Sequence, residues 1–108
     1  MITLQDKELH DFLFNHVDDM KAENIITLDV RDKSSITDFM IVCTGTSKRH
    51  VSSIASNVSD KVKDLGLMPY GVDGEAEGEW VVVDMGDVMI HILQAEYREL
   101  YQLEKLWS

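Results

Sequence analysis

The side chains that could bind a metal or act as nucleophiles are few and scattered. The chain has four histidines and one cysteine, Cys43. His10 and His16 are six residues apart, so they lie on different faces of a helix. No two histidines have the H-x-x-x-H spacing of a zinc site. Cys43 lies in the apolar run FMIVC, which favours a buried, unreactive thiol, while a spatial pairing with His91 stays open. We expect no metal site, no cofactor and no internal disulfide.

The segment CTGTSKRHV has the order of an anion-binding turn. It predicts a strand, a glycine turn and a helix N-terminus, where exposed amides attract anions, with Lys48 and Arg49 in the first turn. It matches neither common phosphate-binding glycine motif. A nucleotidyltransferase would also need a pair of acids on an adjacent strand to hold magnesium, and no D-x-D or E-x-D pair follows this helix. No serine stands in G-x-S-x-G. We predict that the protein is not an enzyme, and nucleotidyltransferase-like transfer remains the alternative.

The last third of the chain gathers a different set of side chains. GEWVVVDMGDVMIHI predicts two strands, Trp80–Met85 and Val88–Leu93, joined by a tight turn. Strand alternation assigns one common face to Trp80, Val82, Asp84, Met89, His91 and Leu93. An aromatic residue and a methionine rimmed by acids are typical of a protein interface. The pattern is equally compatible with a core role for the apolar members, with only the aspartates solvated.

The charge balance points to the class of partner. Twenty acidic and ten basic residues give the 108-residue chain a formal net charge of −10. The phosphates of a nucleic acid repel such a chain, so direct nucleic-acid readout is not expected. A basic protein is the natural electrostatic complement, although the acids could serve solubility alone. The sequence has no membrane-length apolar run and no secretory signal, which predicts a cytoplasmic protein.

Two amphipathic helices and several strands must position these residues. Apolar spacing predicts a helix over 4–22, capped by Thr3, and a second helix from the N-cap Ser47 to Leu65, with Gly66 as its C-terminal glycine. Residues 24–31 predict a strand with one solvated face, and residues 38–44 a central strand buried on both faces. MPYGV is short and peripheral, and the tail from 95 to 107 has helical periodicity. We predict a single α/β domain, residues 1–108, with a mixed sheet of about five strands flanked by helices.

The ordered set of motifs along the chain resembles the ribosomal silencing factor family, also called the Iojap family, over nearly its whole length. The resemblance rests on Asp38-Phe39, on Thr44-Gly45-Thr46-Ser47 with Arg49-His50-Val51, on Glu75 and Gly78 before Trp80-Val81, on Asp84-x-Gly86-Asp87-Val88 with His91, and on Glu96-x-Arg98, Tyr101, Leu103-Glu104 and Leu106-Trp107. Each piece alone is weak, whereas the set with these spacings is specific. Met85 stands where family members often have an aromatic residue.

The resemblance implies a nucleotidyltransferase-like fold that lacks the catalytic acids. It also implies a translational repressor that acts when nutrients are short. Such a protein binds the large ribosomal subunit at large-subunit ribosomal protein fourteen and sterically blocks association with the small subunit. Organellar relatives imply an alternative role as a large-subunit assembly factor, and the family implies a possible homodimer off the ribosome.

The surface we expect to contact the partner combines these motif positions with the chemistry of their side chains. Trp80 is expected to act as an apolar anchor, and the aspartates to meet Lys or Arg on the partner. The predicted protein-binding residues are Trp80, Asp84, Met85, Asp87, Met89 and His91, with Tyr97, Arg98 and Tyr101 adjoining.

Overall fold

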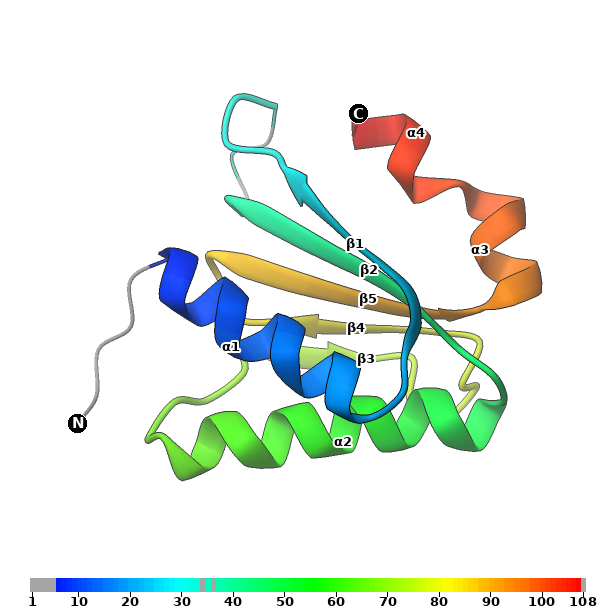
Figure 1. The fold of residues 1–108 in the computed structure, drawn as a ribbon, viewed down its shortest axis with the longest axis horizontal. Helices are drawn as coiled ribbons and strands as arrows, with labels where there is room; N and C mark the ends of the chain where they lie inside the picture. Colours follow the sequence, from blue (N-terminus) through cyan, green and yellow to red (C-terminus); the bar gives the residue numbers. More distant parts are fainter. Residues whose placement is uncertain (1–5, 34, 36, 108) are drawn as a thin grey trace.

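One mixed sheet with helices on both of its faces forms the structure (Figure 1). The computed structural model describes residues 6–33, 35 and 37–107. In chain order the elements are α1 (Asp6–Asp19), β1 (Glu23–Asp29), β2 (Phe39–Gly45), α2 (Lys48–Asp64), β3 (Gly71–Asp73), β4 (Trp80–Asp84), β5 (Val88–Gln94), α3 (Ala95–Tyr101) and α4 (Leu103–Trp107). The predicted α/β class and the mixed five-stranded sheet are confirmed.

The strands lie in the order β1-β2-β5-β4-β3, so the last long strand of the chain pairs with the second. β2 and β5 run parallel, from Phe39 beside Val88 to Gly45 beside Gln94. The other neighbouring strands are antiparallel, including the predicted hairpin of β4 and β5. A parallel neighbour requires a long crossover, which α2, β3 and β4 supply here. The central strand β2 is buried along most of its length, as its apolar composition predicts.

The two faces of the sheet are covered very differently. α1 and α2 pack together on the first face and bury an extended core that includes Ile41, Cys43 and Ile90. The second face has a much smaller buried cluster, with Val42 and Leu93 beneath α4. Figure 1 shows α1 and α2 side by side, and α3 and α4 apart from them across the sheet. The amphipathic stripes predicted for the first two helices therefore both face one side.

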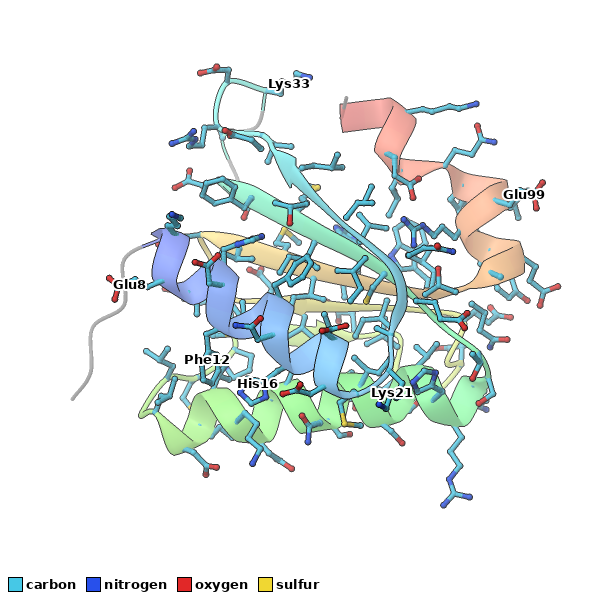
Figure 2. The ribbon with its side chains drawn as sticks, in the orientation of Figure 1. Glu8, Phe12, His16, Lys21, Lys33 and Glu99 are labelled. Carbon is cyan, nitrogen blue, oxygen red and sulfur yellow. The ribbon has the colours of Figure 1, made fainter. Side chains whose placement is uncertain are left out.

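The first two helices end in the same way but with different residues. Gly66 ends α2 with φ 83°, as predicted, whereas Lys21 takes the corresponding position after α1 with φ 66° (Figure 2). The Lys21 amide donates to the Asp18 carbonyl at 2.9 Å, and the Ala22 amide donates to the Val17 carbonyl at 3.1 Å. This pair of bonds is the Schellman arrangement, which requires a left-handed residue and therefore favours glycine.

Two predicted boundaries are wrong. α1 ends at Asp19 rather than near residue 22, because the left-handed Lys21 stops the helix; the predicted cap Thr3 lies outside the described residues. The tail forms two short helices instead of one, because Gln102 adopts a left-handed conformation with φ 48°. The break separates Leu100, which is 69% exposed, from Leu103, which is buried. The predicted single helix of the tail is therefore divided in two.

Replacing Lys21 with Gly is expected to raise the free energy of unfolding by about 0.5–1 kcal/mol, because glycine adopts positive φ without steric cost. Urea unfolding monitored by circular dichroism measures the change. Lys61→Gly, in the interior of α2, is the matched control and should lower stability by about 1 kcal/mol. Equal destabilisation by both substitutions would contradict the assignment of Lys21 as the left-handed cap.

Candidate functional site

The register of the hairpin brings four of the predicted contact residues onto the second face of the sheet: Trp80, Asp84, Met89 and His91. Trp80 pairs with Leu93, Val82 with His91, and Asp84 with Met89. Because β2 pairs with β5 in parallel, Val42 and Met40 continue this face on the next strand. The shared face predicted from strand alternation is therefore confirmed, and it lies opposite the face that α1 and α2 cover.

This face is neither fully core nor fully solvated. Trp80, Val82 and Met89 are each partly exposed, as is Asp84. Trp80 also packs against the small buried cluster of Val42 and Leu93. The core alternative holds only in part, because these apolar side chains contribute to packing and also retain exposed surface, and the interface alternative stays a prediction.

Trp80 is held by contacts on two sides. Its indole Nε1 donates to His91 Nδ1 at 3.1 Å, and its ring centroid lies 4.8 Å from that of Tyr101 on α3. Aromatic pairs at this separation are mutually stabilising. Trp80 is therefore fixed in orientation by one residue of the sheet and one of the C-terminal helices.

His91 is buried, with 7% of its surface exposed, and its Nε2 has no hydrogen-bond partner among the described residues. Because Nδ1 accepts from Trp80, the neutral ring carries its proton on Nε2. Desolvation by burial lowers the pKa of His91 from 6.5 to about 4. The imidazole is therefore an uncharged donor buried within the second face.

The β4–β5 turn orders the two aspartates in different ways. The Asp84 carboxylate accepts from the Gly86 amide at 2.8 Å, so it stabilises the turn. Asp87 has an exposed side chain, while its backbone carbonyl accepts from the Asp38 and Phe39 amides. Met85 is buried, with 7% of its surface exposed, and belongs to the core on the first face. Of the turn residues predicted as contacts, Asp87 presents the most accessible side chain.

The adjoining residues Tyr97, Arg98 and Tyr101 all lie on α3. The Tyr97 hydroxyl donates to Glu79 Oε2 at 2.7 Å, which raises the pKa of Tyr97. The Arg98 side chain is turned inward, with 13% of it exposed. Tyr101 is 47% exposed and lies against Trp80. Tyr101 is thus the member of this group that continues the partly exposed aromatic surface.

Sequence reasoning missed two exposed apolar residues before β3, one of which lies beside the β4–β5 turn. Tyr70 is 81% exposed and Met68 is 69% exposed. The Tyr70 amide donates to the Asp84 carbonyl at 2.7 Å, and its ring lies against Gly86, where an added Cβ would come within 2.6 Å of it. The signal was the aromatic residue in MPYGV, a segment read only as peripheral. The strand pairing that places it beside the turn was not visible in the sequence.

Two backbone amides at the predicted phosphate-binding turn are engaged in internal hydrogen bonds. The Thr46 amide donates to His50 Nδ1 at 2.9 Å, and the His50 amide donates to the predicted N-cap Ser47 at 3.1 Å. The His50 Nε2 bonds to the Met20 carbonyl at 2.7 Å, so it ties the start of α2 to the end of α1. This histidine therefore has a structural role, as has His16, which packs against Phe12 in α1 (Figure 2).

The candidate metal and nucleophile residues are not brought together. Within the described part of the chain, no three His, Cys, Asp or Glu side chains are placed to hold a metal ion. Cys43 faces α1 and α2 whereas His91 lies on the second face, so the pairing left open above does not occur. Burial raises the pKa of Cys43 to about 12, which confirms an unreactive thiol. None of the described helices could span a membrane.

The fold is a small α/β domain with a partly exposed sheet face, and comparisons with known proteins identify its family. Residues 3–108 match the family described as "Ribosomal silencing factor during starvation". A ribosomal silencing factor from Haemophilus influenzae is 48% identical over 93% of this chain and 98% of its own. The chain belongs to the ribosomal silencing factor family, as its motifs predicted.

A more distant relative and a solved structure agree with this assignment. "Mitochondrial assembly of ribosomal large subunit protein 1" from mouse is 32% identical over 91% of this chain and 44% of its own length. A crystal structure of a protein from Chromobacterium violaceum superposes with a TM-score of 0.94 at 36% identity, covering 96% of this chain and 87% of that one. The observed architecture is therefore shared within the family.

Replacing His91 with Gln should flatten the loss of stability in acid. Between pH 6.5 and about 4, the unfolded chain binds a proton on His91 that the folded chain does not. The stability that folding gains from keeping His91 neutral is fully present above pH 6.5. It is lost as the pH falls toward 4, which lowers the free energy of unfolding by at most roughly 3 kcal/mol. Gln can still accept from Trp80 but does not titrate. Urea unfolding at a series of pH values measures the difference, with His16→Gln as control. Parallel curves for wild type and His91→Gln would refute the linkage.

Proposed function

We propose that this protein represses translation by binding the large ribosomal subunit at large-subunit ribosomal protein fourteen and blocking association with the small subunit. Family membership and the names of its relatives support a role on the ribosome. The observation that carries the site assignment is the partly exposed second face, where Trp80 lies at one end of β4 and Met89 pairs with Asp84 at the turn end. The repressor acts in the cytoplasm and performs no chemistry.

The contact surface combines an apolar centre with an acidic rim. Trp80, Val82 and Met89 form the centre, and Asp84 and Asp87 lie at the turn end. Exposed aromatic rings lie near both ends of β4: Tyr101 packs against Trp80, and Tyr70 lies against Gly86 of the turn. Met85 supports the hairpin from the core side, and His91 supports Trp80. A buried aromatic centre with a charged rim is the usual arrangement of a specific interface.

The charge of the chain suits a ribosomal partner. Ribosomal proteins are generally basic, and a net charge of −10 favours their approach while it disfavours contact with ribosomal RNA. Once bound, the protein blocks subunit association by its size alone. A body with principal extents of 38 × 30 × 21 Å on a joining surface prevents a second particle from meeting that surface.

Two other roles stay distinguishable by experiment. An assembly role is favoured by the name of the mouse relative; it predicts precursor particles on deletion and no effect on the joining of purified mature subunits. A nucleotidyltransferase-like activity predicts magnesium-nucleotide binding by calorimetry.

A homodimer off the ribosome is also part of the proposal, and light scattering of the free protein tests it.

Saturating amounts of the protein should prevent purified large and small subunits from forming complete ribosomes in a sucrose-gradient joining assay. Trp80→Ala should relieve the block by weakening binding by about 2 kcal/mol or more, roughly a 30-fold rise in Kd, if Trp80 is the anchor. The Kd is measured by pelleting with large subunits.

Trp80→Phe is the matched variant. Because it retains an apolar ring, it should bind more tightly than Trp80→Ala. It cannot donate a hydrogen bond to His91, so it separates the effect of the ring from that of the hydrogen bond. A folded Trp80→Ala variant that pelleted like the wild type would remove Trp80 from the site. Full subunit joining in the presence of saturating bound protein would overturn the steric mechanism itself.

Replacing Asp84 and Asp87 together with Asn should slow association with large subunits about two- to tenfold at low salt and flatten its salt dependence. Asn at position 84 can still accept from the Gly86 amide, so the turn is retained. The control is Asp60→Asn with Asp64→Asn, which removes the same charge from the exposed side of α2. Equal slowing by both pairs would indicate a general charge effect rather than a contact at the turn.

A further inference from the structure

The C-terminal helices lie over the predicted anchor. Tyr101 of α3 stacks near Trp80, with ring centroids 4.8 Å apart, and Leu103 of α4 packs into the small cluster with Val42 and Leu93. We call residues 95–105 the lid. For Trp80 to enter a pocket on a partner with its full ring, Tyr101 has to move away from it.

The lid has few apolar attachments. No residue of α3 is buried, and Leu103 is the buried member of the lid among the described side chains. Leu100 is 69% exposed. An open pocket of about 350 Å³ is lined by Asn24, Thr44 and several lid residues. Segments with little buried apolar area open at lower free energy than the core does.

Polar contacts centred on Arg98 hold the lid instead. Its guanidinium donates to the Asn24 carbonyl of β1, to Thr44 Oγ1 of β2 and to Glu104 of α4. Partial burial opposes ionisation of Glu104, but hydrogen bonds, including that from Arg98, hold the pKa of this carboxyl below its usual value. One side chain thus joins both lid helices to the edge of the sheet, and loss of any one acceptor weakens the attachment.

The structure with the lid closed also contains a buried donor that has no partner among the described residues. His91 Nδ1 accepts from Trp80 at 3.1 Å, and Nε2 is buried without a hydrogen-bond partner among the described residues. A buried donor without an acceptor disfavours the conformation that contains it. A conformation in which Nε2 donates to an acceptor, such as a carbonyl oxygen of a docked protein, is stabilised relative to the closed conformation.

We propose that residues 95–105 form a displaceable lid, clamped by Arg98, that opens when a protein partner docks on Trp80 and supplies an oxygen acceptor to His91. The closed lid lowers apparent affinity in proportion to the rarity of the open state. This inference rests on the proposed docking role of Trp80. It adds a conformational step that the docking role alone does not require.

Two variants release the clamp at residues outside the proposed contact surface. Glu104→Gln weakens the ion pair with Arg98, and Thr44→Val removes the hydroxyl acceptor. Glu99→Gln is the charge-matched control, since Glu99 is an exposed residue of α3 (Figure 2) and accepts none of the three Arg98 hydrogen bonds described above. Hydrogen exchange of amides 95–105 in the free full-length protein measures opening, and pelleting with purified large subunits measures Kd.

The lid predicts faster exchange and a Kd lowered about three- to tenfold for both release variants, with neither change for Glu99→Gln. Faster exchange with an unchanged or raised Kd would overturn the lid, while a binding defect in Trp80→Ala would leave the proposed function standing. Unchanged exchange in both release variants would overturn the Arg98 clamp. Wild-type binding by Trp80→Ala would instead remove the proposed docking role, whatever the exchange data show.

Discussion

The parallel pairing of β2 with β5 is the constraint on which the rest of the structure depends. It places the hairpin of β4 and β5 beside a strand from the first half of the chain. It also forces the intervening chain to cross over one face of the sheet, which α2 does with α1 beside it. The opposite face then carries Trp80, Asp84 and His91, and only two short helices remain to cover it.

This unequal covering explains how a small chain reconciles stability with binding. The first face buries a long series of aliphatic side chains under α1 and α2, and this core carries most of the hydrophobic stabilisation. The second face can therefore keep partly exposed apolar residues without loss of the fold. Hydrogen bonds centred on Arg98 and on the Trp80–His91 pair hold the residues of this face in place, and they bury little apolar surface.

Local patterns predicted most of the elements correctly. Alternation in GEWVVVDMGDVMIHI assigned the faces of β4 and β5, and Ser47 and Gly66 marked the two ends of α2. The patterns failed where a residue without special propensity adopts a left-handed conformation. Lys21 and Gln102 do so where their amides close backbone hydrogen bonds at the end of a helix, and neither residue type signals a positive φ.

The sequence by itself determined the α/β class, the family motifs, the acidity and the composition of the hairpin surface, because these depend on residue type and short-range spacing. Only the tertiary structure decided which of those residues are accessible. It buried Met85, turned Arg98 inward, left His91 with an unsatisfied nitrogen and brought Tyr70 to the turn. Each of these outcomes depends on contacts between segments far apart in the chain, which no local pattern specifies.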